Sequence, residues 1–218
     1  MASRIIHLAI TDRILKGYRC KDRNRLELGS ILPDAAAGGN SHLKTGIANG
    51  TKKTYDLTAF RSKFLTKMTE DDLYLGYYMH LIQDMYFRNF VYNRYHWNPL
   101  PPGNVERLHH DYALINQYVV QKYALTDTIT VPSEFDAEPL NELGPFTIRQ
   151  FLADMKTDFH SSPTGTAFFF TPKMADEFIT LAGEKCEHEI DSLYNGLDCI
   201  DEKTLAWRNF KFADSRSN

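Results

Sequence analysis

One stretch without proline, residues 69–93, limits the possible folds of this chain more than any other part of its sequence. It reads TEDDLYLGYYMHLIQDMYFRNFVYN, and Thr69 with Asp72 three residues later is typical of a helix start. No loop signal interrupts the stretch, so we predict one long helix that ends near residue 93. Together with the helices expected elsewhere, it predicts a mainly α fold, a single-domain multi-helix bundle around this helix with little or no sheet.

His80 and Asp84 stand four residues apart in this predicted helix, so their side chains emerge on one face. Leu73 and Tyr77 share that face, and a carboxylate buried among apolar residues must be paired or bound to a metal. Gly76 lies one turn before His80 and removes side-chain bulk, as a ligand or a second backbone against the helix would require. The pair therefore indicates a metal site, although a His–Asp hydrogen bond inside a core would give the same pattern.

The composition predicts a globular chain with a small or neutral partner. Hydrophobic residues make up 43% of the 218 residues, which is enough for a core, and the net charge is only −3. No segment concentrates Lys and Arg, so we expect no specific nucleic-acid surface and no acidic membrane as partner. No apolar run reaches the roughly 18 residues that a transmembrane segment needs.

The first residues of the chain and the distribution of its cysteines favour a cytoplasmic protein. The interrupted segment 1–10 does not fit a signal peptide. The cysteines are odd in number and scattered, which suits a reducing compartment and argues against a disulfide scaffold: Cys20, Cys186 and Cys199. We therefore expect one cytoplasmic domain over residues 1–218, and nothing in the composition predicts its oligomeric state.

Most of the remaining chain is also predicted to be helical. Apolar periodicity and cap residues predict helices over 3–16, 24–34, 55–67, 104–123, 147–159 and 171–194, and a short one near 204–210. Residues 35–53 are rich in Ala, Gly, Asn and Thr and are predicted to form a loop, and residues 126–131 a short strand.

Three further residues could join His80 and Asp84 at a metal site. His7 lies on the apolar side of the first helix, Asp34 follows a proline at the head of the loop, and His42 stands near the middle of the loop. Taken alone, each has a simpler explanation than metal binding: His7 as a core histidine, Asp34 as a turn carboxylate and His42 as a solvated histidine. Together they are nitrogen and carboxylate donors without thiolate, which suits zinc, with manganese or iron possible. Two carboxylates also allow one to bridge two ions, an arrangement that activates water and holds phosphoryl oxygens.

The order of these residues resembles the zinc-dependent phospholipase C family and related nucleases. The features in common lie within roughly residues 1–120 and are His7, Pro33-Asp34, His42 and the motif Gly76-x-x-x-His80-x-x-x-Asp84. The resemblance implies one zinc held by Asp34, His42, His80 and Asp84. It also implies that Asp84 bridges to a second zinc, which His7 binds.

The chain departs from that family at three places. Secreted members bind zinc through the amino group and carbonyl of a processed N-terminal residue, whereas this chain begins Met-Ala-Ser. They carry a histidine six residues after the aspartate, where this chain has Phe90. They complete a third zinc site with the motif H-x-x-x-E. Neither His109 nor His110 is followed four residues later by a glutamate, so this chain lacks that motif there. We therefore expect two ions at most.

A second zinc held only by His7 and Asp84 would have too few protein ligands, because zinc usually takes three or four. Asp111 is the first candidate to complete this site, since it lies about 70° from the centre of the apolar stripe of its helix at 100° per residue. His109 is the second candidate and Glu106 the third.

The predicted activity is hydrolysis of a small phosphoester by a zinc-bound hydroxide, which makes the protein a metal-dependent phosphoesterase. Asp34 would be either a ligand or the general base. An alternative of a different class is a non-catalytic module in which a metal only ties the first helix to the long one. A coordination shell closed by protein would favour that module, because catalytic zinc keeps an open position.

A second alternative is an HD-type phosphohydrolase. It would use His80, the pair His110-Asp111 and then Asp154 or Asp158. The helical angle predicts that His110 faces solvent, away from the core. That orientation does not favour a ligand.

Overall fold

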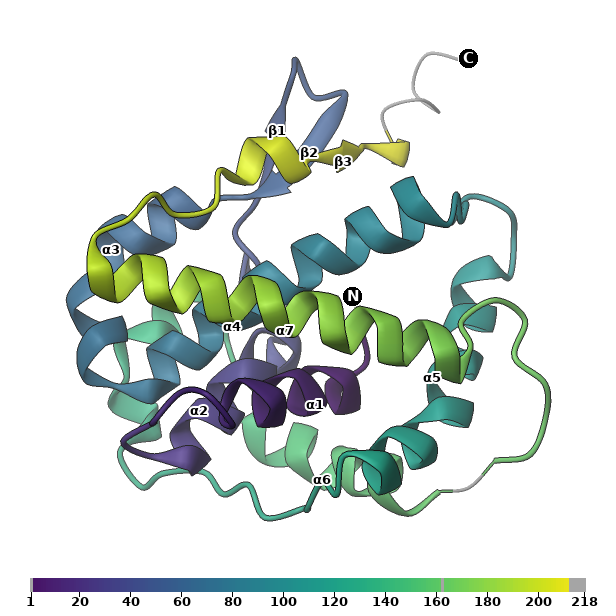
Figure 1. Ribbon diagram of the computed structural model, residues 1–218, viewed down its shortest axis with the longest axis horizontal. Helices are drawn as coiled ribbons and strands as arrows, with labels where there is room; N and C mark the ends of the chain where they lie inside the picture. Colours follow the sequence, from purple (N-terminus) through teal and green to yellow (C-terminus); the bar gives the residue numbers. More distant parts are fainter. Residues whose placement is uncertain (1, 162, 212–218) are drawn as a thin grey trace.

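Seven α-helices contain most of the residues that the computed structural model describes, 2–161 and 163–211 (Figure 1). In chain order they are α1 (Arg4–Ile14), α2 (Arg23–Ile31), α3 (Leu57–Glu70), α4 (Asp72–Arg88), α5 (Asn104–Lys122), α6 (Ile148–His160) and α7 (Pro172–Asn195). The predicted mainly α fold is therefore confirmed. None of these helices combines the length and apolar character that crossing a membrane requires.

α4 is the central helix. Nearly all of its residues are buried, and it contacts α2, α3 and α7. It begins at Asp72 rather than Thr69, because the Asp71 side chain accepts a backbone N–H of the first turn and caps the helix. The π-helical turn η2 (Asn89–Arg94) continues it. The helical stretch thus ends where the sequence predicts.

Two glycines allow α2 and α4 to approach closely. A Cβ at Gly76 would lie 2.3 Å from the Leu26 carbonyl oxygen, and a Cβ at Gly29 would lie 2.2 Å from the Leu73 carbonyl oxygen. No side chain fits at such distances, so the two backbones are in direct contact. The space at Gly76 therefore accommodates a second backbone, one of the two reasons expected from the sequence. The same contact brings the end of α2 beside His80.

Gly76→Ala is expected to destabilise the protein by about 2 kcal/mol, since overpacking costs about 3 kcal/mol and the better helix propensity of alanine offsets about 1 kcal/mol. The displacement of α2 should also lengthen the hydrogen bond from His80 to the Ser30 carbonyl. Urea denaturation of the metal-free protein measures the change. Gly17→Ala is the control, because a Cβ at Gly17 would meet only the Ile14 carbonyl oxygen at 4.0 Å. Equal stability of the two variants would contradict the close contact.

A small antiparallel sheet lies at one edge of the helices, at the top of Figure 1. Its strands, in order, are β1 (Lys44–Ile47), β2 (Lys52–Tyr55) and β3 (Trp207–Arg208). β1 and β2 form a hairpin that begins in the segment predicted to be a loop, 35–53, and ends at the predicted start of the next helix. At its tip, Asn49 and Gly50 have positive φ angles of 54° and 83°. Asn-Gly between two short runs of strand-forming residues is a hairpin signal, so this element was readable in the sequence.

Two minor predictions are wrong because tertiary contacts override the local pattern. Residues 126–131 form no strand. The Asn24 side chain instead binds the backbone of Thr130, accepting its N–H at 2.7 Å and donating to its carbonyl at 3.0 Å. Residues 204–210 do not form a helix. The short 3-10 turn Glu202–Leu205 is followed by β3, which pairs with β2.

Candidate metal centre

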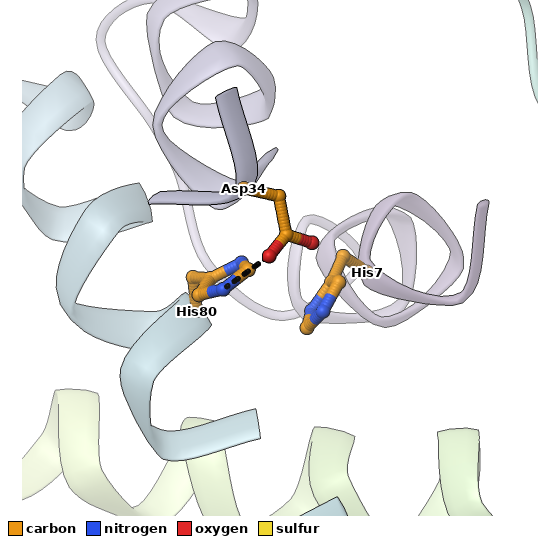
Figure 2. A group of neighbouring side chains, drawn as sticks. All are labelled: His7, Asp34 and His80. Carbon is orange, nitrogen blue, oxygen red and sulfur yellow. Dashed lines mark ion pairs between the residues drawn. The ribbon is translucent and has the colours of Figure 1, made fainter. Parts of the chain in front are cut away.

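Five side chains converge in the interior from four separate segments. His7 comes from α1, Asp34 from the 3-10 turn after α2, His42 from the loop before β1, and His80 and Asp84 from α4. They form two overlapping groups whose ligand atoms lie within 4.8 Å of one another: His7, Asp34 and His80, and His42, His80 and Asp84. Figure 2 shows the first group, in which each side chain comes from a different segment. The structure thus brings together the five residues that the family resemblance names as ligands.

Each imidazole is held through Nδ1, which leaves Nε2 to face the other ligands. Nδ1 of His80 lies 2.8 Å from the Ser30 carbonyl oxygen, and Nδ1 of His7 lies 2.7 Å from Gln83 Oε1. Both partners can only accept, so both Nδ1 atoms carry the proton and both Nε2 atoms carry a lone pair. Nδ1 of His42 lies 3.1 Å from the hydroxyl of the preceding serine. Such outer hydrogen bonds are typical of metal-binding histidines, because they fix the tautomer and the ring orientation.

The atoms that face one another are mostly acceptors. His7 Nε2 and Asp34 Oδ1 are buried and have no hydrogen-bond partner within the described part of the chain. His80 Nε2 lies 3.2 Å from His42 Nε2, and Asp34 Oδ1 lies 3.2 Å from His42 Nε2 and 3.8 Å from His80 Nε2. Buried atoms of this kind cost free energy unless a proton or a cation joins them. Ligands about 2.0–2.1 Å from a tetrahedral zinc lie about 3.3 Å apart, so the observed spacing fits an ion of that size.

Asp84 presents its two oxygens to two different histidines. Oδ1 lies 3.7 Å from His7 Nε2, and Oδ2 lies 3.6 Å from His42 Nε2. Oδ1 also accepts the Ala2 N–H at 3.0 Å, and Oδ2 accepts the Tyr55 hydroxyl at 2.9 Å. These bonds fix the orientation of the carboxylate. A carboxylate held in this way can offer one oxygen to each of two neighbouring ions.

Tyr55 and Arg88 form an outer layer around Asp84 that the sequence did not reveal. Arg88 Nε donates to the Tyr55 hydroxyl at 3.0 Å. Trp207 of β3 packs on both side chains, with its ring centroid 4.7 Å from the Arg88 guanidinium carbon and 5.1 Å from the Tyr55 ring centroid. Only the fold brings β2 and β3 against α4, so no spacing along the chain could have identified Tyr55.

Burial and neighbouring charges set the protonation states that metal binding requires. Burial lowers the pKa of His7 to about 4 and also lowers the pKa of His80, so both imidazoles are neutral at neutral pH. Burial opposes the ionisation of Asp34 and Asp84, but the surrounding histidines hold the pKa of both carboxyls below its usual value. Neutral imidazoles and ionised carboxylates are the forms that bind metal ions.

The metal-free protein is expected to lose stability as the pH falls from 6.5 to about 4. His7 in the unfolded chain takes up a proton near pH 6.5, whereas burial lowers its pKa to about 4 in the folded protein. The unfolded state binds more protons in this range, so the free energy of unfolding falls by about 3 kcal/mol. Urea titrations in chelator across the range measure the effect. His7→Gln cannot take up the proton, so it should reduce the dependence to the part that His80 contributes, and an unchanged dependence would contradict this assignment.

Among the described residues, the exposed edge of the centre lies at Asp34 and His42. The side chains of His7, His80 and Asp84 are 0% exposed, whereas those of Asp34 and His42 are each 8% exposed. Two cavities meet at Asp34. The helix cavity, of about 350 Å³, is lined by α1, α5 and α6 and includes Asp34, His109, Tyr112 and Phe151. The loop cavity, of about 290 Å³, is lined by Asp34, residues 36–41, His42 and Lys44.

A larger cavity, of about 520 Å³, lies between the sheet and the C-terminal segment. Arg61, which lines this cavity, is held by two neighbouring side chains. Arg61 Nη2 lies 3.7 Å from Glu202 Oε2, and Arg61 Nη1 donates to the Tyr78 hydroxyl at 2.6 Å. None of the five converging ligands lines it. Asp34 Oδ1 and His7 Nε2, two of the buried atoms without a hydrogen-bond partner, lie among the five converging side chains, so we place the candidate site there.

Asp111 has a different role from the one expected, which was to complete a second zinc site. It is buried, but its oxygens accept the backbone N–H groups of Phe168, Phe169 and Phe170, each at 2.8 Å. These bonds satisfy the carboxylate and attach the segment before α7 to α5. The helical angle correctly places Asp111 on the buried side of α5. That angle cannot distinguish a carboxylate that binds backbone from one that binds metal. His109, the second candidate, lines the helix cavity.

The residues of the HD-type alternative do not gather around His80. The His110 side chain is 44% exposed, as predicted, and Asp111 binds backbone. Asp154 and Asp158 of α6 are bound to other side chains. None of these joins His80 in the groups of described residues that could hold a metal ion. The geometry therefore does not favour this alternative.

Comparison with known proteins assigns no family to this chain. No protein-family model, curated protein sequence or solved structure matches it significantly. The interpretation of the site therefore depends on the positions and the chemistry of its own side chains.

Proposed function

We propose that the protein is a metal-dependent hydrolase whose centre is held by His7, Asp34, His42, His80 and Asp84. The main support is the set of facing acceptor atoms, which are buried, spaced as ligands of a common ion and in part without hydrogen-bond partners. Nitrogen and carboxylate donors without thiolate suit zinc, and they are compatible with manganese or iron. The two oxygens of Asp84 are arranged to serve one ion or two.

In the proposed centre, the buried residues bind the metal and the residues at the cavities face the substrate. A bound metal lowers the pKa of a coordinated water and withdraws charge from a phosphoryl oxygen. His7, His80 and Asp84 are fully buried and hold the ion from the interior. Asp34, where the two cavities meet, completes the ligand set or takes a proton from the attacking water.

A small phosphoester is the proposed substrate. A pair of carboxylates that can bridge two ions suits phosphoryl chemistry, and the order of ligands resembles zinc-dependent phospholipases C. The cavities of about 350 and 290 Å³ beside Asp34 have the size of small-molecule sites. A metal that only ties α1 to α4 would need a shell closed by protein. The exposed edges of Asp34 and His42 argue against that.

Metal analysis combined with a substrate screen tests the proposal. Purified untagged protein is analysed for bound metal and then assayed with phosphomonoesters and phosphodiesters, before and after chelation. We expect about one or two equivalents of zinc or a similar ion, and a hydrolysis that chelation abolishes and added metal restores. A metal-free native protein with full thermal stability would overturn the proposal. Bound metal without activity on any phosphoester would favour the non-catalytic module.

A further inference from the structure

The loop cavity contains one charged side chain that the proposed metal centre does not use. Lys44, the first residue of β1, lines this cavity together with Asp34 and His42. Its ammonium forms no hydrogen bond or ion pair with any residue that the structure describes. Neither carboxylate of the proposed centre pairs with this ammonium: Asp34 Oδ1 lies 3.2 Å from His42 Nε2, and Asp84 Oδ2 accepts the Tyr55 hydroxyl. The ammonium is therefore available to a ligand from solution.

The backbone of Lys44 is held in place by Asn40. The Lys44 N–H donates to Asn40 Oδ1 at 2.8 Å, and Asn40 Nδ2 donates to the Lys44 carbonyl at 3.4 Å. Leu43, between His42 and Lys44, has a left-handed φ of 48°, and its carbonyl accepts the Asp56 N–H at 2.9 Å. One short turn therefore positions both a candidate metal ligand, His42, and the cation.

The Lys44 side chain lies on the same side of the hairpin as the metal centre. Its Nζ is 5.9 Å from the centroid of the Tyr55 ring, and the Tyr55 hydroxyl donates to Asp84 Oδ2. The register of the hairpin explains this, because Lys44 and Tyr55 are opposite each other on β1 and β2. The ammonium is thus close to the bridging carboxylate without being paired to it.

The charge balance of the loaded centre favours an anion in the loop cavity. In the two-ion form of the proposed centre, the ions would carry twice as much positive charge as Asp34 and Asp84 carry negative charge, and Lys44 would add to this excess. Apart from these groups and His42, the cavity is lined by proline, alanine, glycine, asparagine and serine. Phosphoryl oxygens are strong acceptors, and lysine is a common phosphate-binding residue because its ammonium has three donors.

We propose that Lys44 binds a non-bridging oxygen of the substrate phosphoryl group in the loop cavity and thereby favours anionic substrates. This inference rests on the proposed metal-dependent function. Lys44 is assigned as a substrate-binding residue, and the class of ligand is a phosphoryl oxyanion.

Inorganic phosphate is the probe, titrated calorimetrically into zinc-loaded wild-type, Lys44→Gln, Lys44→Arg and Lys52→Gln proteins. Lys44→Gln should weaken phosphate binding about tenfold or more, and Lys44→Arg should weaken it less because arginine keeps the charge. Lys52→Gln is the matched control and should bind phosphate like wild type. Lys52 is exposed in the same hairpin, but it is three residues from Tyr55 and so points to the other face of β2.

Zinc content, measured in all four proteins, separates this inference from the function on which it rests. Equal zinc content with weaker phosphate binding in Lys44→Gln, and not in Lys52→Gln, supports the role of Lys44. Equal zinc content with unchanged phosphate affinity in Lys44→Gln overturns that role and leaves the metal centre intact. Equal weakening in Lys44→Gln and Lys52→Gln also overturns it, because it shows an effect of overall charge. A wild-type protein that takes up no zinc overturns both proposals.

Discussion

Asp84→Ala is expected to lose every ion that the wild-type protein binds. Asp84 Oδ1 lies 3.7 Å from His7 Nε2, and Asp84 Oδ2 lies 3.6 Å from His42 Nε2. The substitution therefore removes a proposed ligand atom from both sides of the centre. Metal affinity should fall by more than about 100-fold, because even changes to residues behind the ligands typically cost about 10–100-fold. Metal content after dialysis against limiting zinc measures the loss.

Chelation provides an internal control for folding in this experiment. The wild-type Tm should fall when metal is removed, since an ion that binds only the folded protein stabilises it. The Tm of Asp84→Ala should be the same with and without chelator, whatever the stability of that variant.

Asp111→Asn is the matched variant for Asp84→Ala, because Asp111 is also a buried helical aspartate. Its oxygens bind the backbone N–H groups of 168–170, so the substitution should lower the Tm but preserve the metal and the response to chelator. Metal retained by Asp84→Ala, or lost from Asp111→Asn, would contradict the ligand assignment.

Asp34→Asn is expected to reduce phosphoester hydrolysis by about 1,000-fold or more while leaving the fold intact. Asp34 borders both cavities, so it is the carboxylate that water and substrate can reach. The amide of asparagine has nearly the same shape, but it cannot take up the proton and is a weaker ligand. Either proposed role is therefore lost. Initial rates on a phosphoester that the wild-type protein hydrolyses measure the effect.

Metal content of Asp34→Asn decides between its two roles. Loss of metal together with activity indicates a ligand, and loss of activity with metal retained indicates the general base. His110→Ala is the control and should keep wild-type turnover, because its side chain is 44% exposed and lies outside the centre. It also tests the HD-type alternative, which requires His110. Wild-type turnover in Asp34→Asn would exclude both roles of the aspartate.

Local patterns in the sequence were sufficient to predict the helices and to place candidate ligands one turn apart on the same helix face. α1 and α7 begin directly after residues 3 and 171, the predicted starts, because the side chains of Ser3 and Thr171 cap the first turn of each helix. His80 and Asp84 share a face in any α-helix, so their pairing required no tertiary information. The hairpin at Asn49 was also readable from its Asn-Gly turn, although a loop was predicted there.

Only the tertiary structure decided that four segments meet at one centre. The helical period identifies the buried face of a helix but not the surface against which it packs, because the burial of apolar side chains is not directional. By helical period alone, Asp84 and Asp111 are alike, because both lie on buried faces. In the structure Asp84 lies among histidines, whereas Asp111 binds backbone N–H groups. The positions of Asp34 and Lys44 likewise follow from long-range contacts, the close packing of α2 on α4 and the pairing of β1 with β2. No spacing along the chain encodes those contacts.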